Sequence, residues 1–146
     1  MIDTIWGSTN KPVASKQLSA ALEPLGINGS LYIGYPIIGS PEGPFPIDAL
    51  LLSPEKGMIV FHLVEGRELG HFEEIQDESY LKLQSKLLQH KQLSRGRELR
   101  VKISVLTFAS ALLDVRKYTT PEYPVCNTDS FRRWHWKRSA VRCQVV

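Results

Sequence analysis

Apolar side chains recur at helical spacing in two stretches of the chain. In residues 13–25 they fall at offsets of three and four, and Pro24 and Gly26 then act as helix-ending residues. Residues 79–93 repeat this spacing, with Tyr80, Leu83 and Leu87 on one face. We therefore predict an amphipathic helix in each stretch.

Three further stretches carry the pattern of β-strands. Residues 31–38 are rich in β-forming side chains but are interrupted by Gly34 and Pro36, which predicts a bent or edge strand. Residues 101–108 alternate apolar and polar positions, as a half-buried strand does. Residues 123–126 follow a turn and predict a short closing strand.

Two aliphatic runs, residues 46–53 and 58–65, flank a turn and predict a β-hairpin. If residues 55–57 form a three-residue loop, Asp48 lies opposite Val64. His62 lies two residues before Val64 on the same strand, so its side chain points to the same side. Asp48, His62 and Val64 therefore share one face of the sheet. The order helix, three strands, helix, strand predicts an α/β fold with a mixed β-sheet flanked by helices.

Length and hydropathy limit the classes of protein that this chain can belong to. At 146 residues and 42% hydrophobic side chains, it is long enough for one sizeable core, and we expect a single domain. Its apolar runs are much shorter than the roughly 18 residues that cross a bilayer, and the first residues lack the basic start of a secretory signal. We therefore expect a cytoplasmic protein without a membrane partner.

Basic charge is concentrated at the end of the chain. Residues 131–146 carry five basic and no acidic side chains, so residues 1–130 carry thirteen basic and fifteen acidic ones. We predict a folded domain over residues 1–130 and a basic, disordered tail over residues 131–146. Aromatic and basic side chains interleave in the tail, as in binders of single-stranded nucleic acid, but its abrupt change of character favours a truncated or frame-shifted end.

The hairpin and its surroundings resemble a known family. A helix, a bent strand, Asp48 at the head of the hairpin, the second aliphatic strand, a helix and a last strand follow one another in residues 1–130. This arrangement resembles the PD-(D/E)xK nucleases. More narrowly, it resembles the nuclease-related domain found in the amino-terminal region of some bacterial superfamily 1 DNA helicases. The resemblance implies a restriction-endonuclease-like sandwich and, in longer relatives, a helicase motor domain as partner.

The family's catalytic pattern is incomplete in this chain. Active members follow the first acid, here Asp48, with an acid-x-lysine triplet on the second strand, and this triplet falls on His62, Leu63 and Val64. Magnesium prefers oxygen ligands, so a histidine and a valine do not replace the missing carboxylate and lysine. We therefore expect a degenerate, non-catalytic accessory domain without a cofactor, which contributes contacts to DNA or to a protein.

Two other functions stay open on the sequence. The first is an active magnesium-dependent DNA endonuclease that uses Asp48 and Glu65, with Glu23 and Arg67 as helpers, if a bulge at Gly66 turns Glu65 to the face of Asp48. The second is a small protein-interaction module with no nucleic-acid role, which the mildly acidic body favours.

Each candidate residue also has an ordinary structural interpretation. An aspartate at a strand end commonly accepts a backbone hydrogen bond, and a histidine in an aliphatic strand is commonly a satisfied core residue. A group of basic residues predicts either a stripe that faces phosphates or a solvated helix face. That group comprises Lys82, Lys86, Lys91, Arg95 and Arg97.

Overall fold

The computed structural model of the chain describes residues 2–35, 38–40, 43–45, 47–88, 94–95, 98–99 and 102–133. Its main sheet contains strands β1 (Ile2–Trp6), β2 (Gly29–Ile33), β5 (Ala49–Ser53), β6 (Gly57–Val64), β9 (Ile103–Ala109) and β10 (Val125–Cys126). The helices are α1 (Pro12–Leu22), α2 (Phe72–Leu88) and α3 (Thr128–Arg133), with 3-10 turns η1 (Glu23–Leu25) and η3 (Val115–Lys117). Two small two-stranded sheets pair β3 (Ile38–Ser40) with β4 (Gly43–Phe45) and β7 (Ser94–Arg95) with β8 (Glu98–Leu99).

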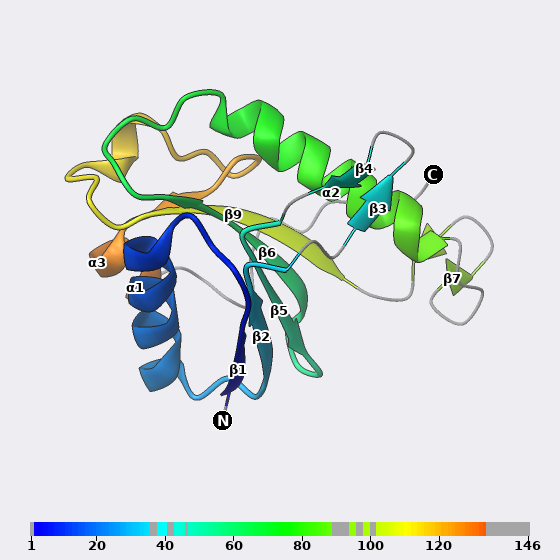
Figure 1. Cartoon of the computed structure of the whole chain (residues 1–146). Helices are drawn as coiled ribbons and strands as arrows, with labels where there is room; N and C mark the ends of the chain where they lie inside the picture. Colours follow the sequence, from blue (N-terminus) through cyan, green and yellow to red (C-terminus); the bar gives the residue numbers. More distant parts are fainter. Residues whose placement is uncertain are drawn as a thin grey trace.

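The six-stranded sheet has the order β1-β2-β5-β6-β9-β10 and is mixed (Figure 1). Pairs β1/β2, β6/β9 and β9/β10 are parallel, whereas β2/β5 and β5/β6 are antiparallel. Helix α1 makes the connection between the parallel strands β1 and β2, and α2 makes the one between β6 and β9. The predicted α/β fold with a mixed sheet flanked by helices is therefore confirmed.

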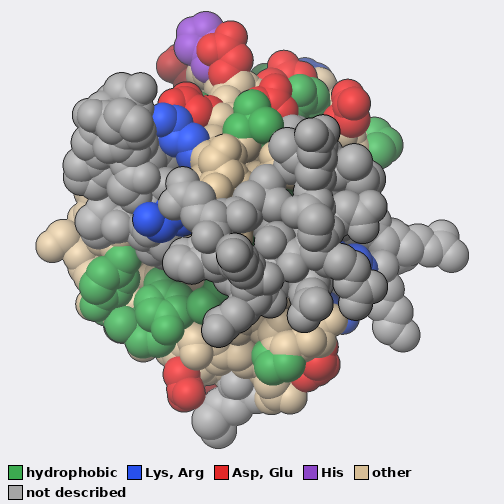
Figure 2. All heavy atoms as spheres, turned by 90° about the vertical axis from the view of Figure 1, so that its right-hand side faces the viewer, with side chains coloured by type: hydrophobic (Ala, Val, Ile, Leu, Met, Phe, Trp, Pro, Cys, Tyr) green, Lys and Arg blue, Asp and Glu red, His purple; other side chains and the backbone are tan. Residues whose placement is uncertain are grey.

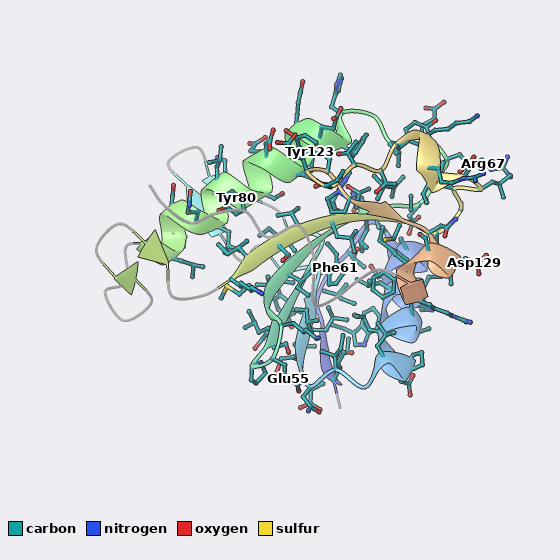
Figure 3. All side chains as sticks on the ribbon, turned by 180° about the vertical axis from the view of Figure 1, so that it is seen from behind. Glu55, Phe61, Arg67, Tyr80, Tyr123 and Asp129 are labelled. Atoms are coloured by element: carbon teal, nitrogen blue, oxygen red, sulfur yellow. The ribbon has the colours of Figure 1, made fainter. Side chains whose placement is uncertain are left out.

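Helices cover both faces of this sheet. Alternate side chains of the central strands, such as Leu51 and Phe61, pack with α1 and α3 on one face. Their neighbours, such as Leu50 and Val60, pack with Tyr80 and the rest of the apolar stripe of α2 on the other. Figure 3 shows Tyr80 and Phe61 on opposite sides of the sheet. This period-two division is what the alternation of strand side chains requires.

The hairpin register differs from the predicted one by two residues. Ser53 pairs with Gly57 next to the turn, and Ala49 pairs with Phe61 at the other end of the hairpin. Continuing this register by one residue places Asp48 opposite His62 instead of Val64. The turn therefore closes one residue earlier than predicted. Gly57 has φ +79°, and a Cβ there would lie 2.6 Å from the Lys102 carbonyl oxygen, so this position requires glycine. A shift of two residues leaves each side chain on its predicted face.

Residues 31–38 were predicted to form a bent or edge strand. Strand β2 ends at Ile33, before Gly34 with φ +76°, and it lies between β1 and β5, so the edge alternative was wrong. The reason is β1, a five-residue strand that the sequence pattern did not reveal and that pairs with β2 in parallel. Helix α2 begins at Phe72, well before the predicted start at residue 79, and its last residue is Leu88. The predicted extension to residue 93 lies outside the described residues.

The folded part continues past residue 130. Phe131 lies on α3, is fully buried and contacts the rings of Phe61 and Phe108 at centroid distances of 6.2 and 5.3 Å. The first residue of the predicted tail, Phe131, therefore belongs to the core, and residues 134–146 lie outside the described part. In that described part, no helix combines the length and the apolar character that crossing a membrane requires.

Candidate functional site

Asp48 lies at the start of β5 and binds two partners with one carboxylate oxygen. Its Oδ2 accepts a hydrogen bond from the backbone N–H of Leu63 at 2.9 Å and lies 2.8 Å from the ammonium of Lys11. The same ammonium donates to the carbonyl oxygen of Leu63 at 2.7 Å. Both charged side chains are largely shielded, with 27% of Lys11 and 21% of Asp48 exposed. The three groups thus form a closed, charge-neutral cluster.

This cluster completes the hydrogen bonds of β6 at the point where β5 has not yet begun. Met58 donates its N–H toward β9, and every second residue of β6 after it faces the same way. The residues in between, Leu63 among them, therefore direct their N–H and C=O groups toward β5. The first paired residue of β5 is Ala49, opposite Phe61, so no β5 residue pairs with Leu63. Asp48 and Lys11 supply the missing acceptor and donor, which confirms the interpretation of Asp48 as a strand-end residue that binds the backbone.

The position of Lys11 is set by the start of α1. Its backbone N–H donates to Thr9 Oγ1, and its carbonyl accepts bonds from the N–H and the hydroxyl of Ser15. Pro12 occupies the first turn of the helix, where its fixed φ is favourable. Sequence reasoning missed Lys11 because its partners lie 37 and 52 residues away in the chain. The only local signal was a lysine directly before a helix-starting proline.

Glu65 belongs to the same end of the sheet but has a different task. It follows the last residue of β6, and its Oε1 accepts bonds from the N–H groups of Val13 and Ala14 at 2.8 and 3.2 Å. These N–H groups lie in the first turn of α1 and have no partner within the helix. A carboxylate there also offsets the positive end of the helix dipole. Glu65 therefore serves as a helix cap supplied from another element.

His62 is a buried and satisfied core residue, as the ordinary interpretation predicted. It is 7% exposed, and its Nδ1 lies 3.1 Å from the hydroxyl of Thr107. Gln76 of α2 donates to that hydroxyl at 2.8 Å and to the Pro124 carbonyl at 3.0 Å, which holds Thr107 in place beside the ring. Nδ1 accepts from or donates to that hydroxyl according to the tautomer of the ring.

Electrostatics keep this imidazole neutral. The pKa of His62 is lowered from 6.5 to about 4, mainly by burial and also by the nearby Lys11 ammonium, while the Asp48 carboxylate acts in the opposite direction. The ring is therefore uncharged at neutral pH. Beside it, Gln76 Oε1 is buried without a partner among the described residues.

The two predicted helper residues are exposed. Glu23 is exposed in η1, beyond the carboxyl end of α1, so the twelve residues that separate it from Lys11 span about 18 Å of helix. Arg67 is exposed on the loop after β6 and lies at the periphery of the molecule in Figure 3. Asp48 and Glu65 thus both contact the segment from Lys11 to Ala14, whereas Glu23 lies at the other end of α1 and Arg67 is exposed on the loop after β6.

The predicted basic stripe is described only in part. Lys82 lies 4.0 Å from Glu78 one helical turn earlier, and Lys86 is exposed in the last turn of α2. Glu73 and Glu74 make the first turn of the same helix acidic, and acidic side chains gather at the top of the face shown in Figure 2. Of the other members, Lys91 and Arg97 lie outside the described residues, and Arg95 is described only by its backbone in β7.

The donor set around Asp48 does not fit a magnesium ion. One oxygen of Asp48 is bound to an ammonium and an amide, Glu65 is bound to α1, and Nδ1 of His62 faces Thr107. Over the described ranges of the chain, no three His, Cys, Asp or Glu side chains are grouped so that they could hold a metal ion. The charges at this end of the sheet therefore serve the backbone and helix α1.

Comparisons of the chain with protein-family models, with curated proteins and with solved structures find no match. The resemblance to a nuclease-related domain thus stays a prediction from the residues quoted above. What the chain does has to be inferred from the contacts of its own side chains.

Proposed function

We propose that this chain is a non-catalytic, nuclease-like accessory domain of a cytoplasmic DNA helicase, and that it contributes contacts to DNA or to a protein such as the helicase motor domain. One observation carries the proposal. The carboxylate of Asp48, the residue that matches the first catalytic acid of the family, is bound to Lys11 and to the backbone of Leu63. A carboxylate that closes the end of a sheet is not available to hold a metal ion.

Energetics support this assignment. A single preorganised group that stabilises a transition state contributes roughly 3 to 4 kcal/mol, which is two to three decades of rate. The triplet position that would supply a second carboxylate is His62, whose ring is neutral and bound to Thr107. The triplet position that would supply a lysine is Val64, which is buried in an apolar cluster. Two such losses together lower the expected rate of hydrolysis by four or more decades.

Plasmid nicking in the presence of magnesium tests the absence of catalysis. We expect the purified chain and its Asp48→Ala variant to leave supercoiled plasmid equally intact. Glu65→Gln is a second control, because it removes the other carboxylate at this end of the sheet. Nicking that depends on Asp48 would refute the proposal.

Contact with DNA is tested separately by fluorescence polarisation of labelled single-stranded DNA across a salt series. We expect binding that weakens as salt rises, because phosphate contacts release counterions. The paired substitution Lys82→Gln with Lys86→Gln should weaken it, whereas Lys16→Gln with Lys56→Gln, two lysines on other elements, should not. If the two double variants bind the DNA with equal affinity, the lysines of α2 do not form the DNA contact. A complete lack of binding would favour a protein partner.

A second candidate function has one observation in its favour. Asp48 and Glu65 both contact the segment from Lys11 to Ala14, so two carboxylates meet at one end of the sheet. An active magnesium-dependent endonuclease would need both carboxylates to release their present partners. Asp48-dependent nicking in the assay above would establish it.

A further inference from the structure

The ammonium of Lys11 stands between two oxygen atoms that face a common point. It lies 2.8 Å from Asp48 Oδ2 and 2.7 Å from the Leu63 carbonyl oxygen. We infer that Lys11 is a built-in cation that replaces a divalent metal ion at Asp48, and that removing its ammonium opens a divalent-cation site made of these two oxygens. The inference rests on the proposed non-catalytic function, because it explains why the Asp48 carboxylate is not free for a metal.

The chemistry of the two oxygens suits a hard cation. One is a carboxylate oxygen and the other a backbone carbonyl oxygen, which are ligand types that magnesium, manganese and calcium accept. Magnesium in particular keeps several of its waters and is often bound through only one or two carboxylates together with phosphate oxygens of a substrate. An ammonium and a divalent ion cannot share the point, because like charges at contact distance repel strongly. Lys11 therefore decides which cation the site holds.

The ammonium reaches this point from a fixed backbone. Both the N–H and the C=O of Lys11 are hydrogen-bonded, to Thr9 and Ser15, before the helix begins at Pro12. A side chain that starts from a fixed backbone loses less conformational freedom when its tip is bound. Glu65 is bound to the first turn of α1, directly after Lys11, and adds negative charge to this end of the sheet. That charge would favour a divalent ion once Lys11 has lost its own.

The test uses the full chain and manganese ions as a paramagnetic probe. Lys11→Met removes the ammonium but keeps an unbranched side chain, and Lys16→Met makes the same change at an exposed lysine of α1. We expect millimolar Mn²⁺ to broaden the amide NMR signal of Leu63 in Lys11→Met. The signal should stay sharp in the unsubstituted chain and in Lys16→Met. Adding Asp48→Asn to Lys11→Met should restore the sharp signal.

Three results would overturn the inference. These are a Leu63 signal that stays sharp with Mn²⁺ in folded Lys11→Met, equal broadening in the unsubstituted chain, and broadening that survives Asp48→Asn. If Lys11→Met does not fold, Lys11→Gln, which also removes the ammonium, takes its place in the same Mn²⁺ titration. Broadening of the Leu63 signal in folded Lys11→Gln supports the inference, and a signal that stays sharp refutes it. Nicking by the unsubstituted chain would refute the proposed function, whereas a metal-free Lys11→Met would refute only this inference.

Discussion

Replacing Asp48 by alanine shows whether this aspartate has a structural or a catalytic role, because the two roles predict opposite changes in the free energy of unfolding. A carboxylate kept for catalysis has unsatisfied charge, so its removal leaves stability unchanged or raises it. Asp48 instead accepts two hydrogen bonds, from the Lys11 ammonium and the Leu63 amide, while it is 21% exposed. We therefore predict that Asp48→Ala destabilises the fold.

The magnitude follows from the two bonds. A hydrogen bond to a charged group contributes about 1.5 to 3 kcal/mol, and partial exposure reduces this for the ion pair, so Asp48→Ala should cost about 2 to 3 kcal/mol. For a chain of this length that loss lowers Tm by about 6 to 9 °C. Asp48→Asn keeps an acceptor for Leu63 but loses the ion pair, and should cost about 1 kcal/mol.

Urea unfolding and differential scanning calorimetry measure these differences. Asp3→Ala is the matched control, because Asp3 is exposed on β1 and its removal should change stability by less than about 0.5 kcal/mol. A double-mutant cycle of Asp48→Asn with Lys11→Met should give a coupling of about 1 kcal/mol. If Asp48→Ala leaves Tm unchanged or raises it, the strand-closing role of this carboxylate is refuted.

Three further predictions concern the core, the helix cap and the buried imidazole. Phe131→Ala should cost about 3 to 5 kcal/mol in urea unfolding, because the ring is fully buried, and a loss below about 1 kcal/mol would place Phe131 outside the core. Glu65→Ala should cost about 1 kcal/mol by removing the cap of α1, and an unchanged Tm would contradict that role. The folded pKa of His62, about 4, lies below its unfolded value of 6.5, so its contribution is fully present above 6.5 and is lost as pH falls toward 4. The free energy of unfolding should fall by up to about 1.4 kcal/mol per pH unit in that window, and an equally steep fall in His62→Gln would contradict this assignment.

Local patterns along the chain determined most of the secondary structure. The helical spacing in residues 13–25 and the aliphatic runs around the hairpin depend on neighbours within one or two turns, so α1, β5 and β6 were predictable. The two-residue repeat also gave the correct face for Asp48 and His62, even though the register was wrong by two. That error came from the turn, which closes with Ser53 paired to Gly57, one residue earlier than the predicted loop over residues 55–57.

Only the tertiary structure decided which strand forms the edge of the sheet, how far along the chain the core extends, and what Asp48 and Glu65 bind. Strand β1 shows little alternation and is defined by its pairing with β2, and Phe131 joins the core only because α3 packs beneath β6 and β9. The pattern of acids and bases identified Asp48 and Glu65 as a pair of interest but gave no information on their partners. Lys11, Val13 and Ala14 reach them across 37 to 52 residues, a separation that no local periodicity encodes. The sequence therefore supplied the charged groups, and the fold decided that they bind one another and the backbone.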